Sequence, residues 1–293
     1  RLIVAAAVAA ALVIVAAGIL WFCARHGRSS LTLSWRKIGF LSLMAALLFW
    51  PTLSWAATLQ GVAQIGLLGW FVWMLKAEFP EDEWIPWAVG GLAASALFGL
   101  AQFFFQAVPP ATWLGVAAQD PAVSGVSVIE AVGRRVLRAY GSFPHPNIFG
   151  GWMAFAALVS VRAFLAASGR AVWRWGALGA LFASALAVSF SRSAWLAFAA
   201  GLSVLGLQAW RAAALKRWLA CAGLLLLPFL GLGLARPEFF VARLGVQGRL
   251  ETRSVDERQA ALRQGWEVVQ AFPLGTGFQA YRLGLERACV SWR

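Results

Sequence analysis

An apolar run of about forty residues, interrupted once near its middle, constrains the fold of this chain more than any other feature. Residues 171–210 are long enough for two membrane-spanning helices, because each needs about 20 residues to cross a hydrocarbon core roughly 30 Å thick. The interruption is the polar sequence Ser189-Phe-Ser-Arg-Ser193. Arg192 therefore lies where the chain turns back at one membrane face. An arginine is costly there unless it faces water, a protein cavity or an anionic ligand, so Arg192 is the first candidate functional residue.

The composition extends this pattern to the whole chain. Of the 293 residues, 61% are hydrophobic and only 13% are charged, which is typical of a polytopic membrane protein and not of a soluble domain. The 17 tryptophans fit aromatic belts at two membrane interfaces. The net charge of +13 follows in part from basic cytoplasmic loops, so the lipid bilayer is an expected partner and nucleic acid is not.

Eight apolar runs predict an all-α, polytopic transmembrane helix bundle that forms a single transmembrane domain over residues 1–293. The runs lie near residues 2–23, 38–56, 59–76, 84–107, 147–167, 172–190, 193–210 and 218–235. Short basic loops follow the first, fifth and seventh runs, and alternation of the spans places all three on one side. The positive-inside rule assigns that side to the cytoplasm. The turn at Arg192 and the segments 108–146 and 236–293 are then extracytoplasmic.

The two longer extracytoplasmic segments are predicted to contain structure of their own. In the outer loop, residues 108–146, the stretch Ser127–Tyr140 has the apolar spacing of an amphipathic helix lying at the membrane interface. Residues 236–293 begin a large periplasmic loop with a helix over Thr252–Gln270, for which Ser254 is the expected N-cap. A turn over Pro273–Gly277 follows this helix.

Arginines are the leading candidate ligands on the outer side. Arg192 has the planar guanidinium that suits bidentate phosphate binding, and Ser191 beside it adds a hydroxyl donor. The alternative is that Arg192 is an interfacial anchor whose charged head reaches water. Arg258 and Arg263 lie on the predicted loop helix, where the alternative to anion binding is a solvated helix face.

A second candidate group precedes the fifth span, at Phe143-Pro-His-Pro-Asn147. The two prolines hold His145 rigidly at the interface, where an imidazole can hydrogen-bond a sugar or assist proton transfer. Asn147 is placed to cap the helix. The alternative is that these residues only form a rigid helix entry. The sequence contains no HExxH motif, Gly-rich phosphate loop or Cys/His set, so no metal and no cofactor are expected.

Three stretches, in this order, resemble the O-antigen ligase and polymerase superfamily of bacterial membrane proteins. They are Arg138–Asn147 before a span, Ser191–Trp195 between two spans, and Ser254–Arg258 with Trp266 and Pro273–Gly277 after the last span. The resemblance covers roughly residues 130–281 and implies a fold similar to that of GT-C-like glycosyltransferases. Members of this superfamily handle glycans linked to undecaprenyl pyrophosphate.

The resemblance also implies roles for individual residues. In the family, the arginine of the Ser-Arg turn and the arginine of the periplasmic loop helix bind the lipid pyrophosphate, and these map onto Arg192 and Arg258. We treat these two as the catalytic residues. Further candidates for substrate binding are Arg138, His145, Asn147, Ser191 and Arg263.

The expected activity is inverting, metal-independent transfer of a glycan from undecaprenyl pyrophosphate to an acceptor hydroxyl. The resemblance places this step at the periplasmic face of the bacterial inner membrane, in the biosynthesis of lipopolysaccharide or another cell-envelope polysaccharide. The acceptor stays open: a lipid A-core glycolipid for a ligase, a second lipid-linked glycan for a polymerase, or a protein hydroxyl for an O-oligosaccharyltransferase.

A flippase or other transporter of lipid-linked glycans is the alternative class. Such proteins scatter polar residues through the middle of their spans, whereas the polar elements here gather at one face. The family also carries a later periplasmic histidine followed by further spans. This sequence stops at Arg293 before them, so we expect a truncated chain that binds the lipid carrier but transfers glycan very weakly or not at all.

Overall fold

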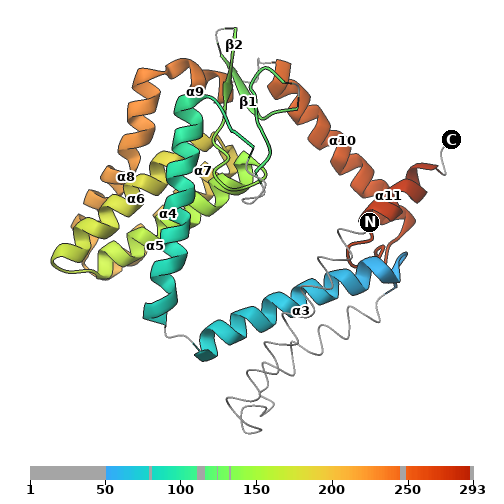
Figure 1. Cartoon of the computed structure of the whole chain (residues 1–293), viewed down its shortest axis with the longest axis horizontal. Coiled ribbons are helices and arrows are strands. Elements are labelled where there is room, and N and C mark those ends of the chain that lie inside the picture. The colour runs from blue at the N-terminus through green and yellow to red at the C-terminus, as the bar shows by residue number, and fades with distance from the viewer. Residues whose placement is uncertain are drawn as a thin grey trace. The chain divides into compact units, whose positions relative to one another are not determined.

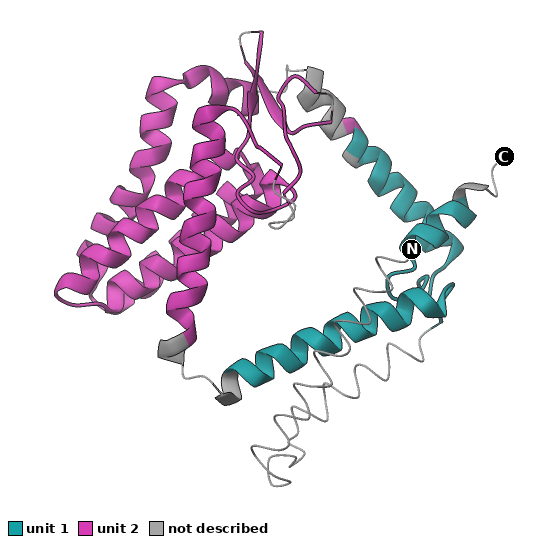
Figure 2. Ribbon diagram, in the orientation of Figure 1, with its two compact units in different colours: residues 1–80, 257–293 teal, residues 81–256 magenta. Residues whose placement is uncertain are grey.

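The computed structural model describes residues 51–78, 81–110, 116–123, 125–131, 133–244 and 249–290. These residues are mostly helical (Figure 1), and six of their helices are long and apolar enough to cross a membrane. The expected all-α polytopic bundle is therefore confirmed. The first predicted span and nearly all of the second lie outside the described residues. The chain divides into two compact units, residues 81–256 and residues 1–80 with 257–293 (Figure 2).

The larger unit, residues 81–256, is a helical bundle with α6 at its centre. Its helices are α4 (Glu81–Phe105), α5 (Pro146–Ala166), α6 (Arg170–Ser189), α7 (Arg192–Arg211), α8 (Leu215–Ala235) and α9 (Pro237–Leu244). Helix α6 packs against α4, α5 and α8. Gly179 of α6 faces Leu225 of α8. A Cβ added at Gly179 would lie only 3.1 Å from a Leu225 methyl group, which is closer than ordinary contact. Small residues of this kind allow helices to approach closely in a membrane bundle.

The expected interfacial helix over Ser127–Tyr140 is wrong, because this stretch forms an antiparallel hairpin. Strand β1 (Val128–Ala131) pairs with β2 (Arg134–Leu137), with Val128 opposite Leu137. Two residues connect the strands, and one of them, Gly133, has a φ of 71° that only glycine adopts freely. The β-branched residues of the stretch favour strands, so the helix-like spacing of its apolar residues was misleading.

Polar side chains at the end of α4 fix the chain that follows the hairpin. Gln102, which is 2% exposed, accepts hydrogen bonds from the backbone N–H groups of Tyr140 and Gly141 and donates to the carbonyl of Gly141. Gln106 accepts from the N–H of Leu137 at 2.7 Å. A buried backbone group without a partner is costly, so these amides position residues 137–141 on the bundle.

Replacing Gln102 with leucine is expected to lower the free energy of unfolding by about 3 kcal/mol, because it leaves buried backbone groups of Tyr140 and Gly141 without partners. The same substitution at Gln208, which is exposed on α7, is the matched control. Denaturant unfolding in detergent measures both variants. Equal stability of the two would show that the Gln102 hydrogen bonds contribute nothing.

The smaller unit contains α3 (Trp55–Glu78), most of α10 (Arg249–Ala271) and α11 (Tyr281–Val290). The Pro273–Gly277 turn docks on the beginning of α3, where the N–H of Leu53 donates to the carbonyl of Thr276 at 2.8 Å. The hydroxyl of Thr58, fully buried, donates to the carbonyl of Phe278. The predicted helix over 252–270 is present, but Ser254 is not its N-cap, because α10 already begins at Arg249.

Candidate functional site

The predicted site residues of the larger unit meet at the turn between α6 and α7. The last carbonyls of a helix lack partners within the helix, and at the end of α6 three successive ones are bound from outside. The carbonyl of Val188 accepts from the N–H of Ala139 at 3.1 Å, and that of Ser189 accepts from Arg138 Nε at 2.8 Å. The carbonyl of Phe190 accepts from Arg243 Nε at 2.7 Å. Two guanidinium groups thus cap the negative end of the α6 dipole.

Phe190 holds this turn in an unusual backbone conformation. Its φ of 49° lies in the left-handed region, which costs a residue with a side chain free energy. The fully buried ring offsets that cost by packing against other aromatic rings. Those rings belong to Phe103 of α4, Trp195 of α7, and Phe239 and Phe240 of α9, with centroids 5.9–6.2 Å from that of Phe190. The conformation of the turn is therefore fixed by the core beneath it.

Arg192 is the first residue of α7, and it is half-buried. Its Nη1 donates to the carbonyl of Arg243 at 3.3 Å. Since Arg243 in turn donates to the carbonyl of Phe190, two hydrogen bonds join the turn to α9. Ser191 is the N-cap residue, but its side chain does not cap the helix and its Oγ lies 3.3 Å from Ser193 Oγ. The first N–H groups of α7 point toward this turn and carry the positive end of the helix dipole.

Helix α5 approaches the same turn through a glycine. A Cβ at Gly150 would lie 2.6 Å from Ser189 Oγ and 3.0 Å from Ser191 Cβ, so any larger residue would push α5 away. The close approach brings the start of α5 to Arg138, whose Nη2 donates to Asn147 Oδ1 at 2.7 Å. Arg138 is only 5% exposed and connects three elements: the segment after β2, the end of α6 and the start of α5.

His145, not Asn147, is the N-cap of α5. Its Nδ1 accepts a hydrogen bond from the N–H of Asn147 at 3.1 Å. The cap lies at this position because Pro146, the first helical residue, has no N–H to satisfy. With Nδ1 used as an acceptor, the neutral ring carries its proton on Nε2, which lies 3.3 Å from Ser127 Oγ. This arrangement suits His145 to donate a hydrogen bond, and makes it a poor candidate for a general base.

The surroundings of His145 also keep it neutral. Burial, together with the positive charges of Arg138 and Arg243, lowers the pKa of His145 from its ordinary value of 6.5. Protonation would remove the Nδ1 acceptor and place a third charge beside two arginines. The imidazole is therefore neutral at pH 7.

The lowered pKa predicts a dependence of stability on pH. Below pH 6.5 the unfolded chain binds a proton at His145 more readily than the folded chain does, so unfolding becomes easier as the pH falls. We expect the thermal unfolding midpoint to decrease from pH 7.5 to pH 5.5 by more in the wild type than in His145→Asn. Asparagine still offers a capping oxygen but does not titrate. Parallel decreases in the two proteins would show that His145 is not the group responsible.

Five of the seven candidate residues lie together around the α6–α7 turn, and their roles in substrate binding stay predictions. The residues in question are Arg138, His145, Asn147, Ser191 and Arg192. Arg258 and Arg263 lie on the part of α10 that belongs to the other unit. Arg263 is exposed, and the side chain of Arg258 lies outside the described residues, so the roles of both stay predictions.

Arg243 is the residue that sequence reasoning missed. It is 7% exposed, binds the carbonyl of Phe190 and lies close enough to affect the pKa of His145. The only sequence signal is an arginine that follows Phe239-Phe-Val-Ala242 on a short apolar helix. Within the described ranges, no group of three or more His, Cys, Asp or Glu residues could hold a metal ion.

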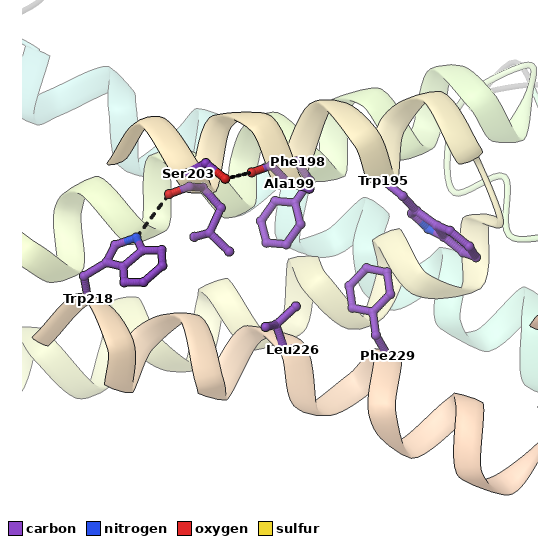
Figure 3. Close-up of a pocket in the computed structure, with 8 residues that line it drawn as sticks. Trp195, Phe198, Ala199, Ser203, Trp218, Leu226 and Phe229 are labelled. Carbon is purple, nitrogen blue, oxygen red and sulfur yellow. Dashed lines mark hydrogen bonds between the residues drawn. The ribbon is translucent and has the colours of Figure 1, made fainter. Parts of the chain in front are cut away.

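An apolar groove of about 360 Å³ leads away from this turn between α7 and α8 (Figure 3). Trp195 and Phe229 lie at one end of the view and Trp218 at the other. The indole N–H of Trp218 donates to the carbonyl of Leu202 at 3.2 Å. Ala199, in the wall of the groove, follows Arg192 by about two helical turns, so the groove lies on the face of α7 that begins with Arg192.

Comparison with known protein families matches residues 177–288 to the O-antigen ligase family. The resemblance to that superfamily is confirmed over this segment. The match and the six apolar helices support a multi-pass membrane enzyme of the O-antigen ligase and polymerase type, with glycosyltransferase or ligase chemistry. No curated protein and no solved structure matches the chain.

The O-antigen ligase match includes Arg192, Arg243 and Arg258, whereas Arg138–Asn147 precedes it in the sequence. The structure brings this preceding segment against the matched part through the bonds of Arg138 to Ser189 and of Ala139 to Val188. The candidate site thus combines residues inside and outside the matched segment.

Proposed function

We propose that this protein transfers a glycan from undecaprenyl pyrophosphate to an acceptor hydroxyl, and that the α6–α7 turn binds the pyrophosphate. The observation that supports this most is the meeting of Arg138, Arg192 and Arg243 at the N-terminus of α7. Guanidinium groups and first-turn N–H groups are both preferred partners of phosphate oxygens. The three arginines come from three different elements, so the folded chain holds them in fixed relative positions.

Stabilisation of the leaving group is the main catalytic task in such a reaction. When the bond between the anomeric carbon and the pyrophosphate oxygen breaks, negative charge accumulates on that oxygen, and fixed cations lower the energy of this state. The acceptor hydroxyl attacks the anomeric carbon from the opposite face, which inverts the configuration, and its proton passes to a base. His145 is better placed to orient the sugar through its Nε2–H than to take up this proton. No metal is needed in this proposal.

The apolar groove between α7 and α8 supports a polyprenyl-linked donor over a soluble nucleotide sugar. Its lining is almost entirely aromatic and aliphatic, and it lies on the Arg192 face of α7. A polyprenyl chain can occupy such a groove next to its own pyrophosphate, whereas a nucleotide has no apolar part to place there.

A photoreactive, polyprenyl pyrophosphate-linked glycan tests the proposal. We expect it to crosslink to peptides that contain residues 138–147 and 189–195, and we expect excess unlabelled donor to compete with it. A photoreactive nucleotide sugar of the same glycan is the control and should label neither peptide. Competed crosslinks confined to other parts of the chain would contradict the proposed location of the donor.

The proposal also requires the α6–α7 turn to face the periplasm, which cysteine labelling measures. In a background without native cysteines, a cysteine at Asp120 should react with an impermeant thiol reagent in spheroplasts. A cysteine at Ala213, in the turn between α7 and α8, should react only after the membrane is opened. This result follows from the basic residues that flank the α7–α8 turn, Arg211, Lys216 and Arg217. Labelling at Ala213 without labelling at Asp120 would reverse the orientation.

A further inference from the structure

A second groove, of about 820 Å³, lies between the end of α4, the hairpin and the junction of α8 with α9. It is distinct from the α6–α7 turn. Phe103 and Phe239 line it, with their rings edge to face at 6.4 Å, and the fully buried ring of Phe190 packs behind both. Among the described residues that line the groove, none is Arg138, Arg192 or Arg243.

The lining of this groove is cationic. It contains Arg134 and Arg135 of β2 and Arg236 before α9, against a single carboxylate, that of Glu238. Arg134 is exposed, and Arg236 is partly neutralised by Glu238, whose Oε1 lies 3.5 Å from Arg236 Nη1. The lining therefore has a net charge of about +2, from three arginines and one glutamate.

Arg135 carries the strongest sign of a missing partner. Its two terminal nitrogens donate to the carbonyls of Ala122 and Val123 at 3.0 and 3.2 Å, which fixes the guanidinium. Its Nε is buried, yet among the described residues it has no hydrogen-bond acceptor. A buried donor on a charged group is costly without an acceptor, and native structures rarely leave one unpaired. Because the exposed area of this Nε is below 1 Å², a ligand oxygen in the groove reaches it only when the Arg135 side chain shifts toward the groove.

Apart from Gln106, the rest of the groove lining is apolar, and it begins where two spans end. Phe104, in the last turn of α4, lines it and is 74% exposed, and Leu232 and Ala235 come from the last turn of α8. The ends of spans lie at the level where lipid acyl chains meet their headgroups. A molecule that fits both parts has a phosphate for the arginines and a hydrocarbon chain for the span ends.

We propose that this groove binds an anionic phospholipid of the surrounding bilayer, with its phosphate at Arg134, Arg135 and Arg236 and an acyl chain against Phe104 and Leu232. The bilayer supplies such a lipid at high local concentration beside the two spans. A bound phospholipid also connects the hairpin to α4 and α8, because its ligands come from all three elements and from the α8–α9 junction.

Native mass spectrometry of the whole chain in detergent tests the inference. The probes are phosphatidylglycerol and phosphatidylcholine with the same acyl chains, titrated without any glycan donor, so the outcome does not depend on the proposed function. We expect one phosphatidylglycerol to bind about tenfold more tightly than phosphatidylcholine, because only the former has a net negative charge to match the arginines. Equal retention of the two lipids would overturn the inference.

The double variant Arg134→Gln/Arg236→Gln should lose about tenfold in phosphatidylglycerol affinity. Both side chains are exposed, so the fold should survive the change. The control is the double variant Arg170→Gln/Arg211→Gln. Arg170 begins α6 and Arg211 ends α7, so both exposed arginines lie at the helix ends away from the α6–α7 turn. This variant should bind the lipid like the wild type. Unchanged affinity of the Arg134/Arg236 variant would overturn the inference. Displacement of the bound lipid by equimolar polyprenyl phosphate would overturn the choice of occupant and assign the groove to the carrier.

Discussion

Replacing Arg192 with lysine is expected to weaken binding of a polyprenyl pyrophosphate-linked glycan by about tenfold or more. A lysine keeps the charge but loses the planar fork that binds two phosphate oxygens at once. The hydrogen bond from Arg192 Nη1 to the carbonyl of Arg243 is also lost, which loosens the contact between the turn and α9. Binding of a fluorescent donor to the purified protein in nanodiscs measures the effect.

Arg211→Lys is the matched control, because Arg211 lies at the other end of the same helix and is exposed. This variant should bind the donor with the affinity of the wild type. If Arg192→Lys also kept wild-type affinity, Arg192 would be an interfacial anchor with no role in binding the donor.

The second large effect is expected at Arg138. Arg138→Met replaces a buried guanidinium with an apolar side chain of similar length and leaves the carbonyl of Ser189 and the Oδ1 of Asn147 without their donor. Hydrogen bonds to charged groups contribute about 1.5–3 kcal/mol each, so we expect unfolding to become easier by about 3 kcal/mol or more. Donor binding should be lost as well, because the start of α5 is no longer joined to the turn.

A double-mutant cycle separates this local effect from general damage. Asn147→Ala should destabilise the wild type, but it should add little in the Arg138→Met background, because the two side chains are joined by one hydrogen bond. Arg162→Met, at an exposed arginine of α5, is the control and should leave stability within about 0.5 kcal/mol of the wild type. Additive effects of the two substitutions at 138 and 147 would contradict the contact.

The spans were predictable because length and hydropathy are local properties. The runs near 172–190 and 193–210 correspond to α6 and α7, and the run near 147–167 corresponds to α5, which begins at Pro146. The hairpin was not predictable in this way. Its apolar residues repeat at helical spacing, and what selects strands is the turn at Gly133 and the pairing of Val128 with Leu137 across it.

The candidate site also contains residues that local sequence predicts and residues that only the folded contacts reveal. Arg138, Asn147 and Arg192 stand in motifs that the sequence displays, so they were found before their contacts were known. Arg243 was missed because its partner, the carbonyl of Phe190, is 53 residues away in the sequence. The capping role of His145 was assigned to Asn147, since both lie beside Pro146 and only the backbone geometry distinguishes them.

The most direct test of the central claim compares two lipids that differ by one phosphate. The wild-type protein is titrated in nanodiscs with polyprenyl pyrophosphate and with polyprenyl monophosphate of the same chain length. Three arginines at the α6–α7 turn predict at least about tenfold tighter binding of the pyrophosphate, because its second phosphate adds charge-assisted hydrogen bonds. Equal affinity for the two lipids would contradict a pyrophosphate site at this turn.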